Sequence, residues 1–230
     1  MTNFDSFIET YLSHIHFGHF ITHSIEVITD LYSSKGLVLI PVLCWMWFQP
    51  HERREWRREI VLATLLSGLM ALFVGRLLAH VLPFSVRPVF NPELHLHFPG
   101  GETNDAQLST WSSFPSDHAM LWMAVATGIF LAWRGIGLMA IIYTALVICL
   151  PRAWLGFHYP TDLLAGAALG VVITLVMTRD SIRVRYASPM VRWIERYPAP
   201  SATLAFVLCV QLVTQFDELR KAAGGLFKNL

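Results

Sequence analysis

Two histidines and one carboxylate stand where long apolar segments begin, with spacing that suits chemistry. His158 and Asp162 are four residues apart, which is one helical turn if a helix begins at His158. On that spacing the carboxylate can hold the imidazole in one tautomer and stabilise its charged form, as a nucleophilic histidine requires. His118 is then available as the proton donor for a leaving oxygen. This division of roles needs no metal ion and no cofactor.

Two arginines, Arg87 and Arg152, also stand at the ends of apolar segments. A guanidinium matches planar or tetrahedral oxyanions with its forked donors, so two that reach one point favour a phosphate or a carboxylate. The stretches "PSDH" and "YPTD" begin two predicted helices whose backbone N–H groups should face the same layer. Pro115 and Pro160 lie where a first helical turn tolerates proline. The sequence therefore predicts an anion site.

The elements that position these residues are predicted from composition. Of the 230 residues, 54% are hydrophobic and 14% are charged, and the apolar residues form long runs. A membrane span needs about 20 mostly apolar residues. We therefore expect an all-α, polytopic helical bundle in one domain, residues 1–230. About six spans are predicted, at 36–48 extended to about 32, and at 59–83, 116–133, 135–151, 160–178 and 197–216.

The first 30 residues differ from the rest of the chain. Residues 4–28 place apolar side chains at near-helical spacing among polar ones, which favours an amphipathic helix in the membrane interface. His19 and His23 are four apart, but no carboxylate-rich motif accompanies them, and no metal site is expected. We expect no cleavable signal peptide, because no basic segment precedes an apolar one. Packing is expected for the cysteines, which lack CxxC spacing: Cys44, Cys149 and Cys209.

Basic residues are distributed between particular spans rather than in one patch. The connections at 51–59, at Arg134 and at 179–196 carry the arginines, so the positive-inside rule places them in the cytoplasm. The connections 84–115 and 152–159 then face outward, as do both chain ends. All the candidate site residues collect on this outer side, which indicates a surface site rather than a path through the bilayer. The net charge of +1 gives no reason to expect a nucleic-acid partner.

The chemistry-bearing stretches resemble a known family. "FPSDHAM" and "PRAWLGFHYPTD" look like the second and third motifs of the type 2 phosphatidic acid phosphatases, P-S-G-H and S-R-x5-H-x3-D, and "HVLPFSVRP" resembles the first, K-x6-R-P. The resemblance covers roughly residues 75–178. It implies removal of phosphate from lipid phosphates or diphosphates through a phosphohistidine, on a helical scaffold and without a metal. It also implies that His158 is the nucleophile, that Asp162 orients it and that His118 is the acid. Arg87, Arg152 and Ser116 would then hold the phosphate oxygens.

Three residues depart from the family's pattern. His80 occupies the position of the lysine, Asp117 replaces the glycine, and Pro151 replaces the serine before Arg152. Asp117 adds a negative charge beside a phosphate, which is tolerable if its side chain turns to the helix N-terminus or to another cation. His80 makes this part of the phosphate site titratable, although Arg76, one turn earlier, could compensate. We count Asp117, His80 and Arg76 among the candidate substrate-binding residues.

Several interpretations remain open at the level of sequence. A helix cap of Ser and Asp would also explain "PSDH", and His95 and His97 are expected to be solvated or at the substrate rim. The leading hypothesis is an outward-facing phosphatase of a bacterial inner membrane, acting on a lipid phosphate in the bilayer. Undecaprenyl diphosphate is the first substrate expected, followed by phosphatidylglycerophosphate and phosphatidic acid. A phosphotransferase and a non-catalytic lipid-binding or transport protein are the alternatives, and no oligomeric state is predicted.

Overall fold

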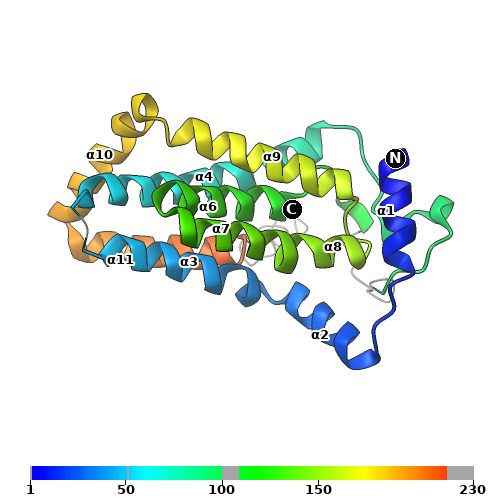
Figure 1. Ribbon diagram of the computed structural model, residues 1–230. Helices are drawn as coiled ribbons and strands as arrows, with labels where there is room; N and C mark the ends of the chain where they lie inside the picture. Colours follow the sequence, from blue (N-terminus) through cyan, green and yellow to red (C-terminus); the bar gives the residue numbers. More distant parts are fainter. Residues whose placement is uncertain (1, 51, 100–108, 217–230) are drawn as a thin grey trace, which may run out of the picture.

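The computed structural model describes residues 2–50, 52–99 and 109–216, and this part of the chain consists of helices, most of them joined by short connections and one followed by a long connection after Val81 (Figure 1). The all-α prediction is therefore confirmed. The α-helices are α1 (Asn3–Ser13), α2 (His19–Asp30), α3 (Tyr32–Phe48), α4 (Arg54–Val81), α6 (Asp117–Ala132), α7 (Arg134–Tyr143), α8 (Leu150–Trp154), α9 (Pro160–Met177), α10 (Asp180–Arg196) and α11 (Pro198–Val213). The described residues also form the 3-10 turns η1 (Pro88–Phe90) and η2 (Pro92–Leu94) and the π-helical segment η4 (Thr144–Cys149).

Helix α6 forms the centre of the bundle, and α4, α7 and α9 run beside it (Figure 1). A helix that is apolar on every face is stable only when it is surrounded. The α6 side chains meet this condition, because Met120, Leu121, Trp122 and Ile129 are fully buried. The central position of α6 matters for the site, since its first turn carries the "PSDH" residues.

Helices α6 and α9 approach closely through two glycines. A Cβ atom at Gly166 would lie 2.5 Å from the carbonyl oxygen of Ser116, and one at Gly170 would overlap the carbonyl oxygen of Met120. Small residues at such a spacing let two backbones meet in a membrane bundle. This contact sets the two helix starts that carry Ser116 and Asp162 side by side.

Each predicted span coincides with an apolar helix. Among the described residues, three helical stretches are long and apolar enough to cross a membrane: Arg54–Val81, Arg134–Trp154 and Pro160–Met177. The pair α2 and α3 passes the same test together, with a bend of 53° between them. Helices α6 and α11 are apolar but shorter. The chain is thus a helical membrane protein, and the number of six spans stays a prediction.

Residues 4–28 form two helices rather than the one that is predicted, and their location in the membrane interface stays a prediction. The structure breaks this segment into α1, which lies across one end of the bundle, and α2, which slants toward α3 (Figure 1). Helix α1 begins with a capping box between Thr2 and Asp5, and its last turn is closed at His14. Gly18 then begins α2, in keeping with the preference of glycine for helix boundaries over helix interiors.

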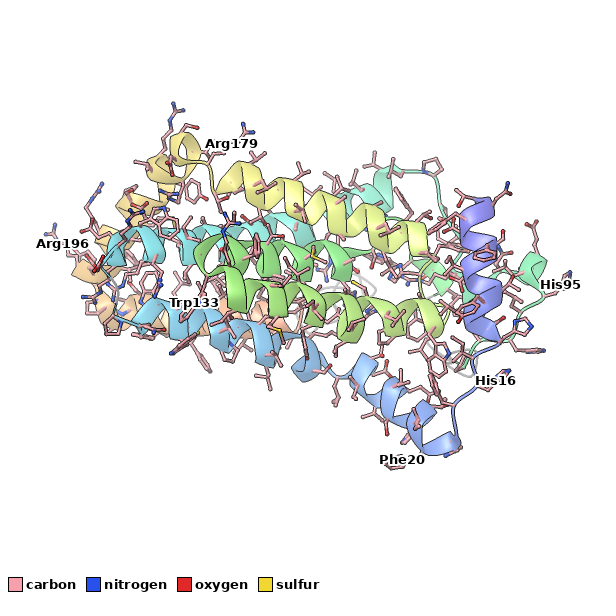
Figure 2. All side chains as sticks on the ribbon, viewed as in Figure 1. His16, Phe20, His95, Trp133, Arg179 and Arg196 are labelled. Carbon is pink, nitrogen blue, oxygen red and sulfur yellow. The ribbon has the colours of Figure 1, made fainter. Side chains whose placement is uncertain are left out.

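The two ends of the bundle differ in their side chains. Figure 2 shows Arg179 and Arg196 at one end, and His16 and His95 at the other. The basic connections therefore lie at the end opposite the long connection that follows α4, as the charge pattern predicts.

Candidate active site

His158 lies in the tight turn between α8 and α9 and is 2% exposed. The turn folds back on α8, so that the backbone N–H groups of Phe157 and His158 both donate to the carbonyl oxygen of Arg152, at 2.9 and 3.3 Å. Gly156 has a φ of +75°, a conformation that side chains rarely adopt. The five residues between Arg152 and His158 therefore form a turn that brings these two side chains close together.

The hydrogen bonds of His158 define its tautomer. Its Nδ1 lies 2.9 Å from the carbonyl oxygen of Ser113, which can only accept, so Nδ1 carries the proton. Its Nε2 lies 3.2 Å from Nη1 of Arg87, which can only donate, so Nε2 keeps its lone pair. Burial, and after it the charge of Arg87, lower the pKa of His158 from its ordinary value. The imidazole is therefore neutral at neutral pH, with a nucleophilic nitrogen beside a guanidinium.

Asp162 lies beside the imidazole, at an ion-pair distance rather than in a direct hydrogen bond. Its Oδ2 is 3.9 Å from Nδ1 of His158, and its role in orienting the ring stays a prediction. It accepts instead from the backbone N–H of Tyr159, at 2.9 Å, and from the hydroxyl of Ser113. The reason is that α9 begins at Pro160 rather than at His158, so Asp162 folds back on the helix start. Ser113 thus links Asp162 to His158, through its hydroxyl on one side and its carbonyl on the other.

His118 has a comparable support. Oδ1 of Asp117 lies 2.8 Å from the backbone nitrogen of His118 and 2.8 Å from its Nδ1. The condition that the sequence sets for Asp117 is therefore met, because the carboxylate faces both the start of α6 and an imidazole. Ser116 is the N-cap of α6, and its hydroxyl accepts from the N–H of Ala119 at 3.5 Å. The helix-cap interpretation of "PSDH" is confirmed, and it is compatible with a site at the same turn.

Two buried arginines flank His158, each 6% exposed. Arg87 donates to the carbonyl oxygens of Phe157, at 2.8 Å, and of Trp111, at 3.3 Å. Within the part of the chain that the structure describes, the buried Nε of Arg152 has no hydrogen-bond partner. A buried donor without a partner is costly. An oxyanion bound between the two guanidiniums would satisfy it, so these residues fit a phosphate.

His80 and Arg76 lie differently from these two arginines. His80 is exposed at the end of α4, and its ring meets Trp111 edge to face, with 4.8 Å between ring centroids. Since the Trp111 carbonyl accepts from Arg87, His80 lies at the rim of the site. Arg76 donates to the carbonyl oxygen of Gln215, at 2.6 Å, and so ties α4 to the end of α11. A role for either residue in binding substrate stays a prediction.

The predicted anion site at the start of α9 is wrong, because the protein fills it itself. The backbone N–H of Thr161 donates to Oδ1 of Asp5 in α1, at 3.0 Å. The N–H of Leu163 donates to the carbonyl oxygen of Tyr159, at 3.2 Å. Sequence reasoning could not foresee a carboxylate that arrives from the other end of the chain.

Sequence reasoning missed two residues of this region, Ser113 and Lys35. Nothing in the pattern around Ser113 marks it, since its role depends on both its hydroxyl and its backbone carbonyl. Lys35 in α3 is 4% exposed, and its charge interacts with those of Arg152 and Asp117. A lone lysine at the outer start of a predicted span was the available signal, because a charge there is costly without a function.

A bundle of apolar helices, with two histidines and two buried arginines gathered at one end, defines a helical membrane protein whose residues at that end suit an oxyanion. The model of the PAP2 superfamily matches residues 60–185, more than half of the chain. The chain therefore belongs to the PAP2 superfamily, as the motifs predict.

Individual relatives are more distant. The chain is 26% identical over 136 residues to the bacitracin transport permease protein BcrC of Bacillus licheniformis, and the aligned region covers 59% of this chain and 61% of the relative. It is 27% identical over 165 residues to the undecaprenyl-diphosphatase BcrC of Bacillus subtilis, and that aligned region covers 72% of this chain and 78% of the relative. A crystal structure of a transmembrane PAP2-type phosphatidylglycerolphosphate phosphatase from Bacillus subtilis has a similar fold, with a TM-score of 0.50 at 21% identity. That match covers 76% of this chain and 85% of the other.

Proposed function

We propose that this protein is a membrane phosphatase that removes phosphate from a lipid phosphate or diphosphate, with undecaprenyl diphosphate as its first expected substrate. Membership of the PAP2 superfamily and the name of the Bacillus subtilis relative support this proposal. The observation that carries it is the state of His158. Its Nε2 keeps a lone pair and lies 3.2 Å from Arg87, while its Nδ1 is anchored on Ser113.

The reaction proceeds in two displacements. Nε2 of His158 attacks the terminal phosphorus, the bond from phosphorus to the lipid-side oxygen breaks, and His118 gives that oxygen a proton. Water then attacks the phosphohistidine and gives its proton back to His118, which releases inorganic phosphate. The positive charge that the imidazole carries in between is spread over Nδ1–H, which donates to Ser113.

Charge stabilisation falls to the buried arginines. Arg87 and Arg152 are placed to hold the phosphoryl oxygens, and the hydroxyl of Ser116 at the start of α6 is the third candidate ligand. Preorganised donors in a site shielded from water stabilise the charge that develops in a transition state. These residues supply the positive charge for the reaction, so we expect turnover without a metal ion or another cofactor.

The orientation follows from the charge pattern. The end of the bundle that carries Arg179 and Arg196 is proposed to face the cytoplasm, and the site at the opposite end to face the periplasm or exterior of a bacterial inner membrane. The chain acts as one domain over residues 1–230, with the motif-bearing core at 75–178. The lipid phosphate reaches the site from the bilayer.

One relative points to a different class, since its name is that of a transport permease. A lipid-binding or transport protein would keep its function without His158. Transfer of the phosphoryl group to a hydroxyl in place of water would keep the phosphohistidine and differ in its product. Phosphatidylglycerophosphate and phosphatidic acid are the alternative substrates.

The test is an assay of the purified protein in detergent, with excess chelator, for phosphate released from undecaprenyl diphosphate, phosphatidylglycerophosphate and phosphatidic acid. We expect His158→Ala to lose at least about a thousandfold in kcat, because the nucleophile is removed. His97→Ala, an exposed histidine of the outer connection, is the control and should keep full activity.

Two further readouts separate the alternatives. An alkaline quench, in which phosphohistidine survives, should trap labelled phosphate on the wild type and none on His158→Ala. Addition of glycerol should give no phosphorylated glycerol if water is the acceptor. Full turnover by His158→Ala would overturn the mechanism.

A further inference from the structure

Helix α1 presents acidic residues to the protein and aromatic residues to its surroundings. Its buried side chains are Asp5, 2% exposed, Glu9, fully buried, and Leu12. Phe7 and Tyr11 on its other face are 71% and 64% exposed. Burying a carboxyl group costs free energy unless it gains partners. The contacts that α1 makes with the bundle must therefore explain why Asp5 and Glu9 are buried.

Asp5 spans the gap between α1 and α9. Its Oδ1 accepts from the backbone N–H of Thr161 at 3.0 Å, and its Oδ2 accepts from the Thr161 hydroxyl at 2.9 Å. Burial opposes the ionisation of Asp5, but the hydrogen bonds from Thr161 and Thr2 outweigh it and hold its pKa below the ordinary value. A carboxylate at a helix N-terminus is favourable, so this contact fastens α1 to the first turn of α9.

The next residue in α9 is Asp162, which accepts from the hydroxyl of Ser113 and from the N–H of Tyr159. Ser113 in turn accepts from Nδ1 of His158. The first turn of α9 is therefore fixed by Asp5 on its outer side. On its inner side it positions Ser113, which in turn orients His158.

Glu9 lies one helical turn after Asp5. Both of its carboxyl oxygens are buried and have no hydrogen-bond partner among the residues that the structure describes. Burial, and after it the charges of Asp5 and Asp162, raise the pKa of Glu9 to about 8. At neutral pH the side chain is therefore uncharged, so it does not repel the carboxylates of Asp5 and Asp162.

We propose that α1 is a positioning element of the active site, in which Asp5 holds the first turn of α9 and the buried carboxyl group of Glu9 makes this docking sensitive to pH. Asp5 and Glu9 are positioning residues, since they act on His158 through α9 and Ser113. This inference rests on the proposed function, because its effect is read in phosphate release.

The docking depends on pH through Glu9. The groups that face Glu9 are Asp5 on its own helix, and Asp162 and Tyr159 at the start of α9. Burial raises the pKa of Tyr159, so its hydroxyl stays neutral over this range. Since the pKa of Glu9 is higher docked than undocked, protonation favours docking. Docking is strongest below the ordinary pKa of a glutamate and weakens as the pH rises to about 8.

The experiment measures kcat and KM against pH, from about pH 5.5 to 9.5, for the full-length wild type, Asp5→Ala and Glu9→Gln. Asp5→Ala removes both acceptor oxygens and should lower kcat by about 10- to 100-fold with little change in KM, as loss of an outer support of an active-site group does. Glu9→Gln should approach the wild type at the low end of this range and keep its activity up to about pH 8, the interval in which the wild type declines. Glu26→Gln, a partly exposed acid on α2, is the control.

A second readout does not depend on activity. Amide hydrogen exchange of residues 159–163, compared at one pH, should be faster in Asp5→Ala than in the wild type, because the Thr161 N–H loses its acceptor. At pH 9 it should be slower in Glu9→Gln than in the wild type. A wild-type kcat for Asp5→Ala, or superimposable pH profiles for the wild type and Glu9→Gln, would overturn the inference. A wild type without phosphatase activity would contradict the proposed function instead, and exchange would still report on the docking.

Discussion

Both histidines of the site are held at the same ring nitrogen. Nδ1 of His158 donates to the carbonyl of Ser113, and Nδ1 of His118 lies 2.8 Å from Asp117. Each support fixes the ring orientation and leaves Nε2 for chemistry. A nucleophile and a proton donor can therefore face one phosphate with the same edge of the ring, although their supports come from different parts of the chain.

Asp117 is the residue at which this chain departs most usefully from the family's motif. We predict that Asp117→Gly, which restores the family's glycine, lowers kcat by about 10- to 100-fold, because His118 loses the partner of its Nδ1. Asp117→Asn keeps an oxygen acceptor at that place and should lose much less. The measurement is kcat and KM for both variants. Equal losses would show that the charge of Asp117, and not its hydrogen bond, matters.

At the scale of elements, the site depends on the approach of α6 and α9. The first turns of these helices carry Ser116 and Asp162, and the backbone N–H of Ser116 donates to the carbonyl oxygen of Asp162 at 3.2 Å. This bond joins the two helix starts directly. The glycines that permit the approach therefore act on the site as well as on stability.

We predict that Gly170→Ala destabilises the bundle by about 1–3 kcal/mol, because its Cβ would overlap the backbone of α6 at Met120. Gly135→Ala in α7 is the matched control, since nothing lies within 4 Å of its added Cβ. The measurement is thermal unfolding of the purified proteins in one detergent. If Gly170→Ala unfolds at the same temperature as Gly135→Ala, the close approach of α6 and α9 is not required.

In the whole molecule, the basic connections and the candidate active site lie at opposite ends of the helical bundle. Arg179 and Arg196 lie at one end of the bundle and His95 at the other, the end of the connection that follows α4 (Figure 2). Under the positive-inside rule this separation predicts which side of a membrane the substrate must reach.

We predict that a cysteine at Glu93 reacts with an impermeant thiol reagent in intact cells and that one at Ser181 does not. Both positions are exposed, Glu93 in η2 and Ser181 in the first turn of α10. The background replaces the native cysteines, and labelling after permeabilisation shows that both sites can react. Labelling of the Ser181 position alone in intact cells would place the site in the cytoplasm.

The sequence by itself determined the helical class, the position of each predicted apolar helix, and the two histidines and two buried arginines that meet at one end, but not Ser113 or Lys35. These are local properties, because the length of an apolar run and the charge of its flanks decide where a helix crosses a bilayer. The proximity of Arg152 and His158 could also be predicted, because the five residues between them form one turn.

The tertiary structure alone decided how those residues are connected. Ser113 and Asp162 are 49 positions apart, and Asp5 and Thr161 are 156 apart. No local pattern encodes such pairs, since a hydrogen bond depends on distances of a few tenths of an ångström that only packing sets. Because α9 starts at Pro160, Asp162 lies 3.9 Å from His158 and is linked to it through Ser113, and the docking of α1 fills the helix start that seemed open to substrate.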